Sequence, residues 1–249
     1  MKKLSLITAL FLSNLFANAQ NFLELVTVEG GTFTMGDEWG LGEDDDATHK
    51  VTLSTFEISK TEVTVQQYRI YCNATGTSMP KEPSWGFSNK NNPIVNISWN
   101  DAMDYTRWLS KKLNKSIRLP YEAEWEYAAR GGIKSKGYKY SGAQTIANTG
   151  CWYDANSNGK VHPVASKEPN ELGLYDMSGN VWEWCMDSYG KDYYDKSPEN
   201  NPKGPTSGES KIMRGGSWNY RGTGCRVAYR FKCKAVCSYD DIGFRVVSY

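Results

Sequence analysis

The sequence predicts a single, loop-rich α+β domain, and three observations support this prediction. The chain of 249 residues contains 9 Trp, 16 Tyr and 23 Gly, but only 39% hydrophobic residues. A core rich in Trp and Tyr needs partners for its indole N–H and phenol O–H groups, and frequent Gly implies many backbone positions outside helix and strand. Neither a linker nor an internal repeat divides the chain, so we expect one domain.

The N-terminal residues are typical of a secretory signal peptide. Lys2 and Lys3 precede an apolar stretch over residues 4–16, and the small residues at 17–19 (Ala-Asn-Ala) form a cleavage site. The apolar stretch is too short to span a bilayer stably. We therefore expect residues 1–19 to be removed and residues 20–249 to form an exported protein of the periplasm, the cell surface or the extracellular space, without a transmembrane segment.

Net charge bears on the kind of partner, and the cysteine content bears on the number of disulfides. Without Lys2 and Lys3 the chain carries 27 basic and 28 acidic side chains. This balance gives no bulk attraction to nucleic acid, so the expected partner is a protein or another surface ligand. Six cysteines in an exported chain allow up to three disulfides, in 15 possible connectivities among which the sequence does not choose.

The first half of the chain contains the clearest periodic elements. Residues 50–58 alternate, with Val51 and Leu53 on one face, and predict a strand. Thr64 stands three residues before Gln67 in a capping-box pattern, which predicts that a helix begins there.

Two further helices and a closing strand follow. Residues 98–114 predict a helix with Ser98 as its N-cap and Asp101 in its first turn. Residues 120–130 predict another, ended by Gly131, in which acidic side chains could be catalytic but are expected to cap the helix and bind loop backbone. Turns and short strands dominate after Gly131, and residues 243–247 predict the last strand.

Six phrases of sequence in a fixed order carry a family resemblance. They are residues 30–36 (GGTFTMG), 118–128 (RLPYEAEWEYA), 173–177 (GLYDM), 179–184 (GNVWEW), 214–218 (RGGSW) and 242–245 (IGFR). Over about residues 24–249 the chain resembles the sulfatase-modifying-factor (formylglycine-generating-enzyme) domain family. The resemblance implies a C-type-lectin-like formylglycine-generating-enzyme fold with few short helices and strands.

The resemblance also implies calcium. Asp176, Gly179, Val181 and Glu183 match the positions that form one calcium site in the family, two by side chain and two by backbone carbonyl. Mixed carboxylate and carbonyl oxygens are the ligands that Ca²⁺ prefers. The alternative is a hydrogen-bonded loop without an ion.

A second, weaker calcium match follows a similar pattern. It comprises four positions: Asn148, Thr149, Asn156 and Asn158. Asn156 stands where the family has a carboxylate, and the loss of that charge weakens the expected site. An Asx-turn is the alternative.

The resemblance places the catalytic question between Trp218 and Arg230. In the enzymes two cysteines separated by four residues follow the Gly-Gly-Ser-aromatic phrase and bind copper(I), a soft ion that suits soft ligands. Counted forward from Trp218, Tyr220 occupies the first cysteine's place and Cys225 the second's; counted backward from residues 242–245, Cys225 falls where the enzymes have an aromatic residue. Cys225 is therefore the one catalytic candidate, and the C-x4-C copper site is absent.

The remaining cysteines allow several pairings. Cys233 and Cys237 could form a disulfide with each other or with Cys225, or replace the lost copper site, and an oxidising compartment favours a disulfide. Cys151 and Cys185 could form another bridge.

The C-terminal region between the fixed phrases suggests recognition. Its chemically mixed positions are Tyr220, Arg221, Phe231, Tyr239 and Asp240. The region resembles the variable region of lectin-fold proteins diversified by retroelements, and aromatic and charged residues on a rigid scaffold suit ligand binding. Ordinary divergence of a surface loop is the alternative.

Three classes of function remain open. We expect an exported, calcium-stabilised ligand-binding or display module without standard formylglycine-generating activity. The alternatives are a copper-dependent oxidase that converts a cysteine of a substrate protein to formylglycine, and a structural component of a surface or secretion complex.

Overall fold

The computed structural model describes residues 23–40, 47–148 and 150–249, and its elements form three small sheets with three helices. The predicted signal peptide and Thr149 lie outside the described residues. The elements are β1 (Leu25–Val28), β2 (Gly31–Met35), β3 (His49–Leu53), β4 (Phe56–Ser59), α2 (Val65–Thr75), α3 (Trp99–Leu113), β5 (Ile117–Arg118), α4 (Glu122–Ala129), β6 (Trp182–Ser188), β7 (Ser210–Arg214), β8 (Phe231–Lys234), β9 (Ile242–Gly243) and β10 (Val247–Ser248), with 3-10 turns η1 (Gly132–Lys134), η2 (Ile146–Asn148) and η3 (Gly222–Cys225).

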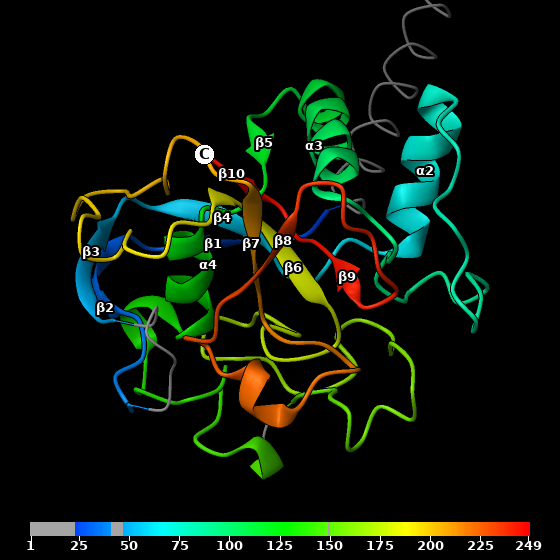
Figure 1. The fold of residues 1–249 in the computed structure, drawn as a ribbon. Helices are drawn as coiled ribbons and strands as arrows, with labels where there is room; N and C mark the ends of the chain where they lie inside the picture. The colour runs from blue at the N-terminus through cyan, green and yellow to red at the C-terminus, as the bar shows by residue number, and fades with distance from the viewer. Residues whose placement is uncertain (1–22, 41–46, 149) are drawn as a thin grey trace, which may run out of the picture.

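The chain ends close to where the described part begins. One sheet has the order β1-β4-β10-β5, so the C-terminal strand lies between elements from the first half of the chain (Figure 1). A second sheet pairs β2 with β3, and a third has the order β8-β7-β6-β9. The contact between β6 and β9 is parallel, with Trp182 opposite Ile242.

The predicted helix caps are confirmed. Thr64 Oγ1 accepts a hydrogen bond from the Gln67 backbone N–H at the start of α2, and the Gln67 side chain accepts one from the Thr64 N–H. Ser98 and Asp101 form the same reciprocal arrangement at the start of α3. α2 and α3 pack together, while α4 lies apart from them (Figure 1).

The predicted strand over residues 50–58 is wrong in one respect. The chain turns at Ser54 and Thr55, and the two halves, β3 and β4, pair in different sheets. Thr55 Oγ1 accepts from the Gly30 N–H, and Asn201 Oδ1 accepts from the Ser54 N–H. These bonds stabilise the turn, which the alternation of apolar residues does not reveal.

The acids of α4 are structural, as expected. Glu122, Glu124 and Glu126 are almost completely buried. They pair with Arg230, Arg118 and Arg214 respectively, and Glu126 also pairs with Arg130. Buried charges need such partners, so these side chains hold α4 against the surrounding loops.

Two aromatic-rich hydrophobic clusters form most of the core, and a small third one contains Tyr140, Cys151 and Cys225. Trp182 and Trp184 on β6 are both buried, and so is Glu183 between them, because both faces of this strand are covered. Within the described ranges, no helix is long and apolar enough to cross a membrane.

Candidate functional site

Trp182 forms the floor of an aromatic platform. The Phe231 ring stacks on it with centroids 5.0 Å apart and an interplanar angle of 19°, and the Tyr220 ring meets it edge-on at 5.2 Å. Tyr229 completes the group, with its centroid 6.1 Å from that of Trp182. We call these four residues the Trp182 platform. Trp182 is 2% exposed and Phe231 is 38% exposed, so Phe231 presents the group to solvent.

Tyr220 is fixed in place by its neighbours. Its hydroxyl lies 3.0 Å from that of Tyr229. Its ring packs so closely on Gly224 that a Cβ there would lie 2.3 Å from Tyr220 Cδ1. The tyrosine therefore fills the position where the forward count places a first cysteine, and it supports the platform as much as it contributes to the surface.

One basic side chain lies next to the platform. Arg221 follows Tyr220 directly, is exposed, and places its guanidinium carbon 5.9 Å from the Tyr220 ring centroid. Lys232 and Lys234 on β8 are also exposed, but they alternate with Phe231 along the strand and therefore point to its other face, where Lys232 lies over the Tyr189 ring at 3.5 Å. The platform thus joins exposed aromatic surface to the cation of Arg221.

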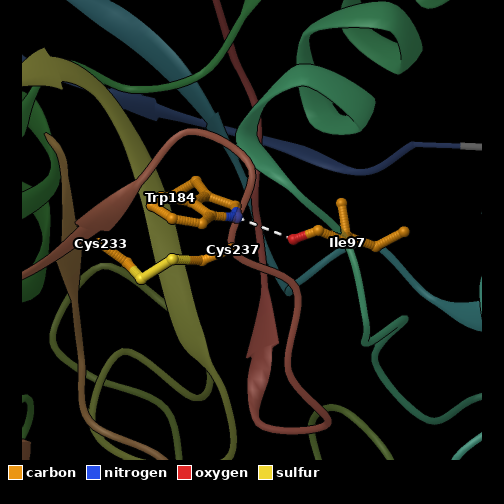
Figure 2. The surroundings of a disulfide bond; sticks show 4 residues. All are labelled: Ile97, Trp184, Cys233 and Cys237. Carbon is orange, nitrogen blue, oxygen red and sulfur yellow. Dashed lines mark hydrogen bonds between the residues drawn. A yellow bond between two sulfur atoms is a disulfide. The ribbon is translucent and has the colours of Figure 1, made fainter. Parts of the chain in front are cut away.

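A disulfide anchors the loop after Phe231. Cys233 and Cys237 are bonded to each other, one of the pairings that the sequence left open, with Cα atoms 6.1 Å apart. Figure 2 shows the disulfide next to the indole of Trp184, whose Nε1 donates to the Ile97 carbonyl. The loop is therefore attached to the core while it presents Val236, which is 70% exposed.

Tyr239 and Asp240 precede Asp241, the residue whose backbone bonds to the platform. Tyr239 is 58% exposed, and the Asp240 carbonyl accepts a hydrogen bond from Trp218 Nε1 at 3.0 Å. The next residue, Asp241, accepts from the Trp182 backbone N–H. The structure thus brings Tyr220, Arg221 and Phe231 together, whereas the described contacts link Tyr239 and Asp240 to the platform through the backbone.

Cys225 is enclosed in the small third cluster. Its exposed fraction is 0%, and its thiol is hydrogen-bonded to that of Cys151, which is equally buried. This hydrogen bond, burial and the charge of Asp154 all raise the pKa of the Cys225 thiol well above its usual range. Because Cys225 is completely buried, a substrate cysteine cannot reach its sulfur, so its surroundings do not fit the oxidation of a substrate cysteine. The bridge suggested between Cys151 and Cys185 is wrong, since both are free thiols in separate clusters.

The first calcium-like set contains an excess of buried negative charge. Asp176 and Glu183 are 5% and 0% exposed, and Glu62, which the sequence did not single out, joins them at 1%. One guanidinium opposes the three carboxylates: Arg245 Nε and Nη2 donate to the two oxygens of Glu183 at 2.6 and 2.8 Å. Burial and the charges of Asp176 and Glu183 raise the pKa of Glu62 well above its usual range.

Asp176 is perturbed in the same direction. Burial raises its pKa to about 6, although its Oδ2 accepts a hydrogen bond from the Ala165 N–H at 2.8 Å. A cation would oppose the negative charge of this cluster, and carboxylate oxygens are donors that calcium accepts, but both oxygens of Glu183 already accept hydrogen bonds from Arg245, and one also accepts from Trp125 Nε1. Among the described residues no three His, Cys, Asp or Glu side chains converge on one metal position. Backbone carbonyls, such as those of Gly179 and Val181, would have to complete the coordination.

In the second calcium-like set, the side chain of Asn156 is bonded to the backbone. Asn156 Oδ1 accepts from the Tyr153 N–H at 2.9 Å, and its Nδ2 donates to the Cys151 carbonyl at 3.0 Å. These bonds tie the Asn156 amide to the backbone of the preceding loop and use both its oxygen and its nitrogen. Asn158 is exposed with φ 56°, Asn148 is described only by its backbone, and Thr149 lies outside the described residues.

The architecture is that of a formylglycine-generating-enzyme type of α+β fold. It superposes on the Treponema denticola variable protein 1 with a TM-score of 0.79 and 29% identity, over 90% of this chain and 94% of that one. It superposes on PvdO from Pseudomonas aeruginosa with a TM-score of 0.77 and 31% identity, over 91% of this chain and 94% of PvdO. The fold class expected from the sequence is thereby confirmed.

The family follows from the sequence matches. Residues 13–249 match the sulfatase-modifying factor enzyme 1-like domain, and the chain belongs to this family. The formylglycine-generating enzyme of Streptomyces coelicolor is 32% identical, over 88% of this chain and 87% of the enzyme. The resemblance inferred from the six phrases is confirmed.

Proposed function

We propose that this protein is an exported, calcium-stabilised module that binds a protein or surface ligand through the Trp182 platform and the side chains around it. One observation carries the proposal: Tyr220 fills the place of a first cysteine and contacts the exposed Phe231 and Arg221, while Cys225 is fully buried. Rigid aromatic anchors with a basic rim are the common composition of binding surfaces.

The framework supports recognition without large loss of entropy. Phe231 rests on the buried Trp182, Tyr220 on Gly224, and the Cys233–Cys237 disulfide restrains the following loop. Side chains that are ordered before binding lose little freedom when a ligand arrives. The similarity to a protein named as variable is also in keeping with a scaffold whose surface residues change.

Array binding tests the proposal. Wild-type protein is applied to immobilised glycans and peptides, beside Phe231→Ala and Arg221→Ala. We expect at least one immobilised ligand to be retained by wild type and bound about tenfold more weakly by each variant. Ile133→Ala is the matched control, because Ile133 is 55% exposed and lies on η1, next to β2. Equal retention by all four proteins would contradict the proposal.

Calcium would stabilise the scaffold and not act in binding directly. Asp176 and Glu183 would supply side-chain oxygens and Gly179 and Val181 carbonyl oxygens, and the ion would oppose the buried negative charge. Isothermal titration with Ca²⁺ tests this, with Mg²⁺ as the control ion. If wild type and Asp176→Asn release the same heat on titration with Ca²⁺, the result would argue against the site. For export, sequencing of secreted protein should find Gln20 as the first residue.

A copper-dependent oxidase is the second candidate, since a relative named as a formylglycine-generating enzyme is 32% identical over 88% of the chain. Incubation with copper(I) and a peptide containing Cys-x-Pro-x-Arg, followed by mass spectrometry, separates the two. We expect no aldehyde. Aldehyde formation that Cys225→Ser abolishes would replace the binding proposal with the enzymatic one.

A further inference from the structure

Cys151 and Cys225 are the two thiols of the small third cluster, and each is completely buried. Tyr140 is the third buried member, and Ile146 and Tyr153 pack against the group. The two thiols contact each other through a hydrogen bond, although they are about 75 residues apart in the sequence.

Two glycines make room for the sulfur atoms. A Cβ at Gly179 would lie 2.6 Å from Cys151 Sγ, and one at Gly216 would lie 2.7 Å from Cys225 Sγ. Both glycines have positive φ, at 81° and 78°. The backbone thus closes tightly around the sulfur pair from two sides.

We propose that Cys151 and Cys225 form a second disulfide in the mature protein, which fixes the turn that carries Tyr220 and Arg221. The surroundings suit this bond better than the alternatives. Both sulfurs are completely buried and out of reach of an outside substrate, whereas a disulfide needs neither access, charge nor a hydrogen-bond partner. Cys72 and Cys185 belong to the other two clusters and have no such neighbour.

The bond forms by thiol–disulfide exchange with a disulfide donor, such as oxidised glutathione or a protein disulfide. One cysteine loses its proton, and its thiolate attacks a donor sulfur and displaces one donor thiol. The second cysteine then attacks the mixed disulfide and releases the other donor thiol, so two electrons pass from the cysteines to the donor. Since both sulfurs are inaccessible in the folded chain, the exchange takes place before this cluster closes.

The bond would restrain the turn that carries two residues of the candidate binding surface, Tyr220 and Arg221. Cys225 is the last residue of η3, which follows Arg221 directly. The Asp154 N–H donates to the Tyr220 carbonyl at 3.1 Å, so the segment that begins at Cys151 already contacts this turn. The cross-link itself does not depend on the proposed function, whereas its effect on binding rests on it.

The test counts thiols in the full mature chain. Protein refolded with reduced and oxidised glutathione is quenched in acid, alkylated in denaturant and mapped without reduction. We expect two alkylated cysteines, Cys72 and Cys185, and a cross-linked peptide pair containing Cys151 and Cys225. Cys151→Ala should leave Cys225 alkylated, while the control Cys185→Ala should retain the cross-link. Four alkylated cysteines in wild type, or a different pairing, would overturn the proposal.

A stability measurement gives an independent readout. In a Cys233→Ser/Cys237→Ser background, any response to reductant reports on the proposed bond. Closing a loop of about 75 residues predicts that reduction lowers the folded-to-unfolded ratio by about a thousandfold. An unchanged urea midpoint after reduction would also refute the bond. Neither readout needs a ligand. A negative result would therefore refute the disulfide alone, and the binding proposal would still be decided by the array test.

Discussion

Replacing Asp176 by asparagine removes one of three carboxylates buried around Arg245. The substitution preserves an oxygen that can accept the hydrogen bond from the Ala165 N–H. Any difference between the two proteins therefore reports mainly on the charge. Because that charge is one reason for the raised pKa of Glu62, its removal also lowers the pKa of Glu62.

The expected magnitude follows from the shift of Asp176. Its pKa rises from 3.8 in the unfolded chain to about 6 in the folded one, so protonation favours the folded state. The corresponding stabilisation is fully present below pH 3.8 and is lost as the pH rises through 6, which amounts to about 3 kcal/mol at 1.36 kcal/mol per pH unit. In chelator, wild type should lose about 2.4 kcal/mol of this relative to Asp176→Asn between pH 4 and 7.5, because the unfolded carboxyl is already partly ionised at pH 4.

Calcium should reverse this trend at neutral pH. An ion bound only by the folded state adds about 2.7 kcal/mol at a free concentration one hundred times its dissociation constant. Urea unfolding at pH 4 and pH 7.5, with chelator or with Ca²⁺, measures both effects, and Asp195→Asn at an exposed position is the control. Parallel pH profiles of wild type and Asp176→Asn in chelator would refute the reasoning.

Three further predictions concern the scaffold. Gly179→Ala should destabilise by at least about 3 kcal/mol in urea unfolding, because φ is 81° and the added Cβ would lie 2.3 Å from the Trp152 carbonyl oxygen; a loss below 1 kcal/mol would contradict the close packing. Glu126→Gln should cost about 3 kcal/mol, since it leaves the buried Arg214 guanidinium without its closest carboxylate, and a neutral result would show that the pair is solvated. Cys233→Ser should lower the free energy of unfolding by about 2 kcal/mol, as expected for a disulfide at sequence separation 4. In a background in which Cys151 is replaced, the Cys233→Ser protein should be as stable as the protein that keeps Cys233 and is reduced.

Local chemistry made the helices predictable. The Thr64–Gln67 and Ser98–Asp101 pairs each satisfy backbone N–H groups within four residues, so the sequence alone specifies where these helices begin. The strand over residues 50–58 was predicted incorrectly because its alternation continues through a change of sheet. Pairing partners, and not periodicity, decide where β3 ends.

The contacts of the buried carboxylates and of the paired cysteines could not be predicted from the sequence. The six phrases led to Asp176 and Glu183, yet Glu62 joins them from a distant segment, and nothing in that segment indicates that its carboxylate meets theirs. The contact between Cys151 and Cys225 likewise depends on how two loops meet across the fold. Fifteen connectivities of six cysteines are indistinguishable until the packing is known.

The position of β8 has a consequence for behaviour at high concentration. It is the outer strand of its sheet, and an outer strand offers unpaired backbone groups to which a second molecule can add. Lys232 and Lys234 place positive charge along this border, so two copies that approach strand to strand repel each other. We therefore expect Lys232 and Lys234 to limit self-association through this edge, and a variant that neutralises both should aggregate at concentrations that wild type tolerates.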